Sequence, residues 1–409
     1  MVCLFEDGFP DSGSAEQTKI TMMEVKVGYK KTEVGVIPED WGVDFIKNLA
    51  VIKTGSKNTQ DRIENGLYPF FVRSQTVERI NSYSYDREAV LTAGDGVGVG
   101  KVIHYVNEKF DCHQRVYRIS DFAPSLNGYF FFLYFSNNFL TRIMQMTAKS
   151  SVDSVRMDMI ANMQIPLPPT KAEQTAIASA ISDADSLINS LEKLIAKKRN
   201  IKQGAMQKLL QPKDGWEVKT LKEVAKYRRG SFPQPYGLDK WYDDSQGLPF
   251  VQVYDVDDNF RLKSETKRKI SKEAQEMSVF IEKGSIIITL QGSIGRIAIT
   301  QYDAYVDRTL LFFESFLVPF DKYYFLLSIY QLFEKEKEKA PGGIIKTITK
   351  EALSSFTISY PKIKEQTRIA TILSDMDSEI ATLETQLEKY RNIKLGMMQN
   401  LLTGKIRLV

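Results

Sequence analysis

One helical segment occurs twice in this chain, about 190 residues apart. The first copy spans residues 173–210 and the second spans residues 365–402, with roughly 22 of 38 aligned positions identical and no gap. The long segments that precede the two copies hardly resemble each other. Because internal repetition is a strong organisational signal in a single sequence, we predict two variable globular parts carried by two constant helices.

Both copies carry an apolar stripe along the helix. Its residues recur at alternating spacings of four and three, which is typical of a coiled-coil seam. A helix of this length is about 50 Å long at ~1.5 Å per residue. The seam positions are Ile177, Ile181, Ala184, Ile188, Leu191 and Ile195 in the first copy, and Ile369, Leu373, Met376, Ile380, Leu383 and Leu387 in the second.

Neither helix can bury its stripe alone, so each needs a partner. The favoured partner is the other copy, because two parts joined head to tail by equal helices can fold back into an antiparallel pair with approximate two-fold symmetry. Two alternatives stay open. Each helix could pack on its own globular part, or the helices of two chains could pair in a homodimer.

The variable parts have a strand-like pattern followed by an aromatic helix, which predicts an α+β fold. The predicted architecture is two globular α/β domains separated by two long helices that form an antiparallel coiled coil, with pseudo-two-fold symmetry. Strands are expected within residues 68–77, 89–106, 165–169, 248–256 and 358–361, two strands around a glycine turn within 279–300, and aromatic helices within 128–144 and 321–336. The predicted bounds are an N-terminal extension at 1–27, domains at 28–168 and 213–360, and helical regions at 169–212 and 361–409. Met22 and Met23 offer an alternative natural start.

Glycines recur at every second position between Gly94 and Gly100. This spacing gives neither the G-x-G-x-x-G pattern nor a P-loop, both of which bind nucleotide phosphates. Glycine tolerates the positive φ and close backbone approach of a tight turn. We therefore predict a rigid turn from which Lys101 projects, with Arg296 after Gly295 as its counterpart in the second half.

Composition excludes several classes of protein. The net charge of +4 and the pI of 8.7 permit nucleic-acid binding without demanding it. Two cysteines, Cys3 and Cys112, and two histidines cannot build a disulfide framework or a zinc site. No apolar run approaches the ~18–20 residues that cross a bilayer, and the first residues lack the features of a secretory signal. We expect a cytoplasmic chain.

Several motifs together resemble the specificity subunit of type I restriction-modification systems. They are the arm GYKKTEVGVIPEDW at 28–41, the junctions IPLPPTKAEQTAIA at 165–178 and ISYPKIKEQTRIA at 358–370, the paired RNIK segments, and the ending LLTGKIRL at 401–408. The resemblance covers nearly the whole chain from about residue 28. Such subunits carry two target recognition domains, each of which reads one half of a split, asymmetric site in double-stranded DNA.

The resemblance also implies partners for this chain. Two conserved helical regions hold the recognition domains apart and dock methyltransferase subunits, commonly two, while translocase and nuclease subunits join for cleavage. The methyltransferase subunits would use S-adenosylmethionine, and the restriction subunits ATP and Mg²⁺. No cofactor is expected in this chain itself.

Arg and Lys side chains recognise guanine, Asn and Gln recognise adenine, and Lys, Arg, Ser and Thr also hold phosphates. These residue types gather in the strand-and-loop segments of each domain. The candidates are Arg73, Ser74, Gln75, Thr76, Arg79, Lys101, Gln114 and Arg115 in the first domain, and Arg228, Arg229, Gln252, Tyr254, Gln291, Arg296 and Arg308 in the second.

An enzyme activity finds little support in the sequence. A base methyltransferase needs a loop that holds the flipped base, but Pro168-Pro169 begins a helix. The triplets Glu24-Val25-Lys26 and Glu217-Val218-Lys219 fit part of a nuclease motif but lack neighbouring carboxylates for magnesium. We expect a non-catalytic chain. The alternative function is a coiled-coil scaffold that binds only proteins.

The helix length suggests how the two halves of a DNA site could be spaced. Half-sites on one face of B-DNA are about 34 Å apart per turn, so a ~50 Å helix can place two domains somewhat more than one turn apart. The helices are therefore predicted to act as a ruler for the unspecified gap.

Overall fold

The computed structural model describes residues 26–146, 154–339 and 350–408. The chain divides into two compact units, one of Met1–Asn189 with Glu388–Val409, and one of Ser190–Leu387. This division cuts both long helices, α4 (Lys171–Leu209) and α9 (Ile363–Leu401). Each unit therefore contains the start of one long helix and the end of the other. Of the predicted extension at 1–27, only the last two residues are described.

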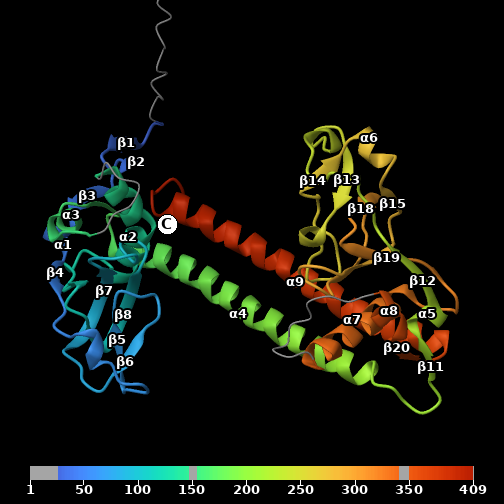
Figure 1. The fold of residues 1–409 in the computed structure, drawn as a ribbon. Coiled ribbons are helices and arrows are strands. Elements are labelled where there is room, and N and C mark those ends of the chain that lie inside the picture. The colour runs from blue at the N-terminus through green and yellow to red at the C-terminus, as the bar shows by residue number, and fades with distance from the viewer. Residues whose placement is uncertain (1–25, 147–153, 340–349, 409) are drawn as a thin grey trace, which may run out of the picture. The chain divides into compact units, whose positions relative to one another are not determined.

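Unit 1 is built on a six-stranded sheet of order β4-β9-β7-β8-β5-β6 (Figure 1). All of its neighbours are antiparallel except β5 and β8, which pair in parallel through Phe70↔Asp111 and Phe71↔Cys112. The C-terminal ends of these two strands consequently meet at one edge of the sheet. The elements are β1 Tyr29–Thr32, β2 Gly35–Pro38, β3 Gly42–Phe45, α1 Ile46–Leu49, β4 Val51–Thr54, η1 Thr59–Asp61, β5 Tyr68–Phe71, β6 Glu78–Ile80, β7 Tyr85–Ala93, β8 Ile103–Cys112, β9 Val116–Ser120, α2 Gly128–Gln145, α3 Met157–Ala161 and β10 Gln164–Leu167.

The aromatic helix α2 lies against β7 and β8 and supplies more residues to the core of unit 1 than any other described element. The side chain of Asn127 accepts a hydrogen bond from the backbone nitrogen of Phe130 at 2.9 Å, which caps the helix start. Phe131, Phe135 and Phe139 recur at four-residue spacing, are fully buried and stack along one face. The expected aromatic helix is confirmed.

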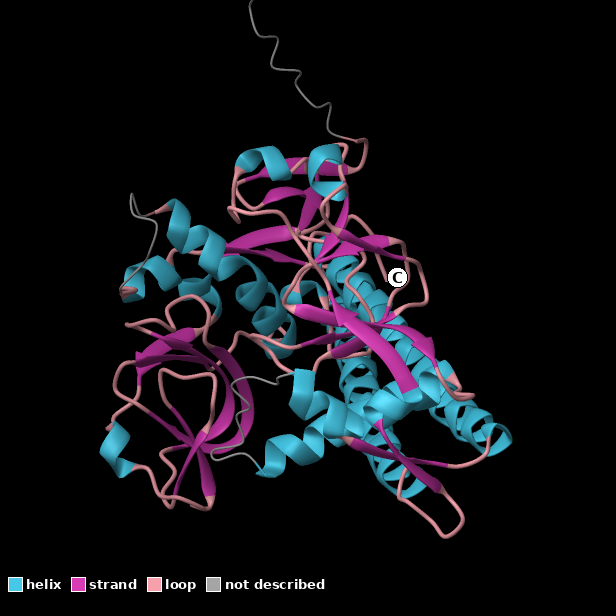
Figure 2. Ribbon diagram, turned by 45° about the vertical axis from the view of Figure 1, so that its right-hand side comes forward, coloured by secondary structure: helices cyan, strands magenta, loops and turns pink. Residues whose placement is uncertain are grey.

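Unit 2 repeats this arrangement with its strands divided between two sheets, β12-β19-β16-β17 and β14-β13-β18-β15 (Figure 2). Strands β13 and β18 pair in parallel, as β5 and β8 do in unit 1. The elements are β11 Glu217–Thr220, α5 Leu221–Val224, β12 Ala225–Arg229, η2 Asp239–Trp241, β13 Leu248–Val251, η3 Val253–Asp255, β14 Arg268–Ile270, α6 Lys272–Gln275, β15 Val279–Ile281, β16 Ile286–Thr289, β17 Ile297–Ile299, β18 Ala304–Val306, β19 Leu310–Phe316, α7 Lys322–Lys339, α8 Lys350–Ser355 and β20 Thr357–Tyr360.

Three strand predictions were wrong in detail. The predicted strand at 68–77 ends at Phe71. Residues 279–300 form three strands rather than two, because Gly284 has a φ of +84° and turns the chain between β15 and β16, which belong to different sheets. The predicted strand at 248–256 ends at Val251. Beyond it, the carboxylate of Asp255 accepts a hydrogen bond from the backbone nitrogen of Gln252 at 2.8 Å, which starts a short 3-10 helix instead.

The N-terminal arm is a β-hairpin, β1 with β2, onto which the C-terminal tail closes. The guanidinium of Arg407 binds both carboxylate oxygens of Glu173, at 2.6 and 2.8 Å, and the carboxylate of Asp40 at 2.9 Å. Gly404 has a φ of +68°, and a Cβ there would lie 2.5 Å from Cδ of Pro38. The tail thereby joins the arm to the start of α4.

Ion pairs join α4 and α9 within each unit. In unit 1, Lys394 of α9 pairs with Asp185 of α4 at 2.5 Å. In unit 2, Arg199 of α4 pairs with Glu384 of α9 at 2.5 Å, and Lys202 pairs with Asp377. From Arg199 to Lys202 the residue number rises along α4, while the number of the partner falls along α9 from 384 to 377, so the two helices run antiparallel there. The predicted antiparallel pairing within the chain is confirmed.

The predicted seam is mostly buried. Ala184, Met376 and Leu383 are half-buried, and the other nine positions are buried. The alternative of packing on the helix's own domain also holds at each helix start, because Ile177 and Ile181 join the core of unit 1, and Ile369 and Leu373 join that of unit 2. Among the described helices, none is both long and apolar enough to span a bilayer.

Candidate nucleic-acid interface

Three loops meet at the edge of the sheet where the two parallel strands end. In unit 1 the backbone nitrogen of His113, which follows β8, donates to the carbonyl of Phe71 in β5 at 2.9 Å. In unit 2 the backbone nitrogen of Asp307, which follows β18, donates to the carbonyl of Val251 in β13 at 3.0 Å. The glycine turn is bonded to the loop after the second parallel strand in both units. The backbone nitrogen of Gly94 donates to the carbonyl of Arg115, and that of Leu290 donates to the carbonyl of Thr309, each at 2.9 Å. We call these loops the loop cluster: 72–77, 94–102 and 113–115 in domain 1, and 252–256, 290–296 and 307–309 in domain 2.

The glycine that follows β4 in unit 1, and the one that follows β12 in unit 2, are explained by this cluster. A Cβ on Gly55 would lie 2.0 Å from the carbonyl oxygen of Cys112, and one on Gly230 would lie 2.2 Å from that of Val306. Any side chain would push β4 or β12 away from the turn that carries the candidate residues. Only glycine allows this close approach in both domains.

The glycine turns are tight and packed, as predicted. Gly100 has a φ of +68° and Gly295 a φ of +83°. A Cβ on Gly100 would lie 2.6 Å from Ile143 of α2, and one on Gly295 would lie 2.9 Å from Phe333 of α7. The turn is therefore pressed against the aromatic helix, which fixes its position at the sheet edge.

Two arginines in the loop cluster of domain 1 share one carboxylate. The guanidinium groups of Arg73 and Arg115 both bind the carboxylate of Asp95, at 2.5 and 2.7 Å. Burial works against ionisation of Asp95, but the hydrogen bonds from the two arginines outweigh it and hold the pKa of this carboxyl below its ordinary value. Gln114 lies beside them and donates to the side-chain oxygen of Asn58 at 2.7 Å. Three predicted residues thus come together: Arg73 and Arg115 contact Asp95, and Gln114 lies beside them.

The other candidates in domain 1 have different surroundings. Ser74, Gln75 and Thr76 are exposed on the loop after β5. Lys101 is exposed, and its ammonium forms no hydrogen bond or ion pair with any residue that the structure describes. Arg79 instead donates to the backbone carbonyls of Gly66 at 2.9 Å and Leu67 at 2.7 Å, so it braces the loop before β5.

In the loop cluster of domain 2, Gln252 is held by Tyr254 of the cluster and by Tyr236 of the loop after β12. The amide of Gln252 lies between the hydroxyls of Tyr236 and Tyr254, donating to the first and accepting from the second. Tyr236 donates to the buried carboxylate of Asp307 at 3.2 Å, and the guanidinium of Arg308 lies 5.3 Å from its ring centroid. Burial, with the nearby charge of Asp255, raises the pKa of Tyr254 to about 12, so this hydroxyl stays a donor at neutral pH.

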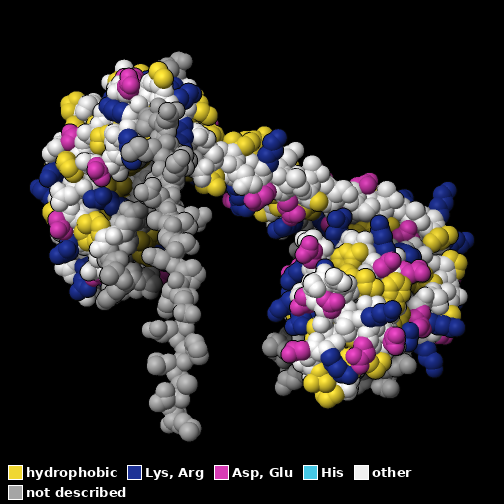
Figure 3. All heavy atoms as spheres, turned by 90° about the horizontal axis from the view of Figure 1, so that it is seen from above, with side chains coloured by type: hydrophobic (Ala, Val, Ile, Leu, Met, Phe, Trp, Pro, Cys, Tyr) yellow, Lys and Arg dark blue, Asp and Glu magenta, His cyan; other side chains and the backbone are white. Residues whose placement is uncertain are grey.

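The remaining candidates in domain 2 divide between exposed and engaged side chains. Gln291 is exposed in the glycine turn, and Arg229 is exposed on the edge strand β12. Arg228 pairs with Glu314 at 2.9 Å. Arg296 pairs with Asp258 at 3.1 Å and donates to the carbonyl of Val256 at 3.3 Å. Basic and acidic side chains are interspersed over the faces seen in Figure 3, in keeping with the mild net charge.

Residues 38–203 and 213–390 each match the family of the type I restriction modification DNA specificity domain. The chain belongs to this family. The putative type I restriction enzyme MjaX specificity subunit of Methanocaldococcus jannaschii is 27% identical over 428 residues, which cover 93% of this chain and 97% of that protein. The EcoDI specificity subunit of Escherichia coli is 30% identical over 169 residues, 41% of this chain and 36% of that subunit.

Two solved structures have folds similar to that of this chain. The S subunit of a type I restriction-modification system from M. genitalium aligns with a TM-score of 0.61 and 16% identity, over 88% of this chain and 96% of that one. A structure from a study of complex assembly in the type I R-M system aligns with a TM-score of 0.58 and 16% identity, over 90% and 99%. Nothing in these comparisons favours the scaffold alternative.

Sequence inspection missed several residues that organise the interface of this DNA specificity chain. Asp95 lies between two of the glycines and holds both arginines, while Tyr236 and Asp307 orient Gln252. A lone aspartate in a glycine turn was the one available signal, and its partners are 20 and 22 residues away. No local spacing rule relates such partners.

The described residues include no group of three or more His, Cys, Asp and Glu side chains placed to hold a metal ion. In the second nuclease-like triplet, Lys219 lies 3.5 Å from Glu217 on β11, and the first triplet falls largely outside the described residues. Burial raises the pKa of the Cys112 thiol to about 12, which makes it a poor nucleophile.

Proposed function

We propose that this chain is the specificity subunit of a type I restriction-modification complex and that each domain reads one half of a bipartite, asymmetric DNA site. One observation carries the proposal. The two domains place the same three loops at the ends of equivalent parallel strands, yet they hold different side chains in position there, two arginines through Asp95 in domain 1 and Gln252 through two tyrosines in domain 2. A shared framework with different contact residues is what an asymmetric site requires.

The chemistry of each loop cluster suggests what each half-site contains. Arginine binds the O6 and N7 acceptors of guanine, and glutamine binds N6 and N7 of adenine. Asp95 fixes Arg73 and Arg115 in position before DNA arrives, and the two tyrosine hydroxyls do the same for Gln252. Domain 1 should therefore prefer a half-site with guanine, and domain 2 one with adenine.

The paired helices would set the unspecified gap and dock the partner subunits. We infer two methyltransferase subunits per chain, because the chain offers two equivalent junctions between a domain and a long helix. S-adenosylmethionine would be bound by those subunits, and ATP and Mg²⁺ by restriction subunits that join the complex. The chain itself would be non-catalytic and contribute sequence recognition alone.

A selection experiment tests this function. The chain, with and without a cognate methyltransferase subunit, is incubated with random duplexes, and the retained DNA is sequenced at a fixed salt concentration, because phosphate contacts make affinity salt-dependent. We expect a consensus of two short conserved blocks with an unspecified gap between them. Retention without sequence preference would instead support the scaffold function.

A further inference from the structure

Domain 2 has a long insertion between two paired strands where domain 1 has a short loop. Residues 252–267 connect β13 to β14, whereas residues 72–77 connect the equivalent β5 and β6. The insertion begins with Gln252 and Tyr254 of the loop cluster. Its middle part, residues 256–262, folds into a small hairpin that bridges Val256 to Leu262. We call this part the strut hairpin.

The strut hairpin is rigidly tied to the loop cluster of domain 2. The buried carboxylate of Asp255 accepts hydrogen bonds from the backbone nitrogens of Gln252 at 2.8 Å and Lys267 at 2.9 Å, which closes both ends of the insertion. Arg296 of the glycine turn holds Asp258 and the carbonyl of Val256. Two of the three loops of the cluster, 252–256 and 290–296, are therefore fastened to the same hairpin.

The tip of the strut hairpin reaches the long helices through one aromatic ring. Phe260 packs edge-on against Tyr330 of α7, with ring centroids 5.0 Å apart, and the ammonium of Lys202 on α4 lies 5.0 Å from its ring centroid. Lys202 in turn pairs with Asp377 of α9, which accepts a hydrogen bond from Tyr323 of α7. The ring of Phe260 therefore contacts a network of side chains that joins α4, α7 and α9.

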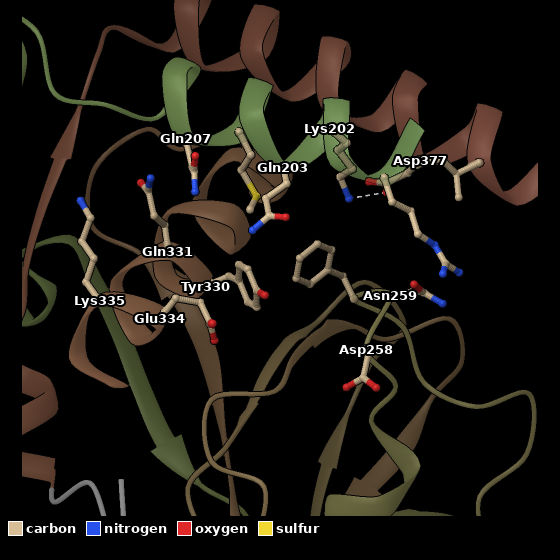
Figure 4. Close-up of a pocket in the computed structure, with 14 residues that line it drawn as sticks. Lys202, Gln203, Gln207, Asp258, Asn259, Tyr330, Gln331, Glu334, Lys335 and Asp377 are labelled. Atoms are coloured by element: carbon tan, nitrogen blue, oxygen red, sulfur yellow. Dashed lines mark hydrogen bonds and ion pairs between the residues drawn. The ribbon is translucent and has the colours of Figure 1, made fainter. Parts of the chain in front are cut away.

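The contact is narrow, because a cavity of about 550 Å³ lies beside Phe260. In Figure 4, Lys202 and Tyr330 face this space from two helices, and Asp258 and Asn259 border it from the hairpin tip. Phe260 also adopts a φ of +62°, a conformation that costs energy for a bulky residue and persists only where its surroundings impose it. A strained backbone that packs this half-buried ring against the core of unit 2 beside the cavity indicates a positioning role.

We propose that Phe260 is a specificity-determining positioning residue, which fixes the loop cluster of domain 2 on the helices of its own unit. This inference rests on the proposed function and deepens it. The backbone nitrogen of Ile299 donates to the carbonyl of Phe260 at 3.1 Å and keeps the hairpin on β17. Loss of the ring removes the contact with α7 and α4 and lets Gln252 and the glycine turn shift together. Recognition of the half-site of domain 2 is lost, while that of domain 1 is unaffected because its short loop makes no such contact.

The test uses the full chain assembled with its methyltransferase subunits and maps methylation at each half-site. Phe260→Asn removes the ring, while asparagine tolerates the left-handed backbone conformation. We expect discrimination at the half-site of domain 2 to fall roughly fivefold or more, the lower end of the cost of one mismatched base pair. Phe260→Tyr, which keeps the ring, and Asn259→Ala, an exposed neighbour at the tip, should leave it unchanged.

Unchanged discrimination at both half-sites, or an equal fall at both, would overturn the role of Phe260. Tyr330→Leu removes the partner ring from α7 without touching the insertion, and it should give the same one-sided loss even if Phe260→Asn does not fold. A wild-type complex that methylates no split site would refute the proposed function instead. The half-site of domain 2 is identified as the one that stays constant when domain 1 is exchanged.

Discussion

At the scale of single residues, the glutamine of each Glu-Gln junction holds the start of a long helix. Gln174 is buried, donates to the carbonyls of Ser125 at 2.9 Å and Pro168 at 3.2 Å, and accepts from the nitrogen of Asn127 at 2.7 Å. Gln366 makes the equivalent bonds to Pro319, Pro361 and Asp321. Each glutamine side chain therefore satisfies three backbone groups, two carbonyls and one nitrogen, which explains why the junction contains glutamine.

Replacing Gln174 by alanine should lower the free energy of unfolding of unit 1. The change leaves buried backbone groups without partners, and we expect a loss of about 2 kcal/mol. Urea unfolding followed by circular dichroism measures it. Gln207→Ala, an exposed glutamine on the same helix, is the control and should change stability by less than about 0.5 kcal/mol. Equal effects of the two changes would contradict the bonding described for Gln174.

The Asp95 cluster predicts a pH dependence. The pKa of Asp95 is lowered in the folded state, so its stabilising contribution is present above the unfolded value of about 4 and is lost as the pH falls through the folded pKa below it. Asp95→Asn should therefore be less stable than the wild type at pH 7, and the difference should shrink below about pH 4. Thermal unfolding between pH 7 and pH 3 measures this. Asp86→Asn, an exposed carboxylate, should show no such trend, and a difference for Asp95→Asn that is constant with pH would be contrary evidence.

At the scale of elements, predictions succeeded where burial follows a local period. The heptad seam predicted the antiparallel helices because each apolar residue must face the partner helix, and the aromatic helices followed from the same rule. The sequence could not place the Arg407–Glu173 pair, whose members are 234 residues apart. The loop clusters were predicted in part. Residue type indicates which side chains can bind bases, but it does not indicate the partners that hold them, because these come from distant loops. Arg79 was predicted to contact DNA, but its guanidinium binds the backbone carbonyls of Gly66 and Leu67 instead.

The glycine turn gives a prediction at this scale. Gly100→Ala adds a methyl group 2.6 Å from Ile143 and forces alanine into a φ of +68°, so stability should fall by about 1–3 kcal/mol. A Cβ added to Gly204 in α4 would meet no atom of the described residues beyond its own helical turn within 4 Å. Gly204→Ala should therefore be neutral or stabilise the chain by up to about 1 kcal/mol. Urea unfolding of both variants is the measurement, and a neutral Gly100→Ala would refute the packed turn.

At the scale of the whole molecule, the paired helices are proposed as the ruler of the DNA site. Seven residues inserted in α4 between 186 and 197, and seven in α9 between 385 and 393, would leave the ion pairs of both units in place. The insertion adds about 10 Å of helix, so the unspecified gap should grow by roughly three base pairs. Methylation mapping measures the gap. An insertion in one helix alone should disrupt assembly, and an unchanged gap after the double insertion would rule out the ruler.

The central claim is that two domains read two half-sites independently, and exchange of one domain tests it most directly. Residues 46–162 are replaced by the corresponding segment of a relative with a different site, which leaves β3, β10, the arm and both long helices intact. The assembled complex is then used to methylate genomic DNA, and the modified sites are sequenced. We predict that one half-site changes to that of the donor, while the other half-site and the gap stay the same. A change in both half-sites, or in neither, would contradict the account.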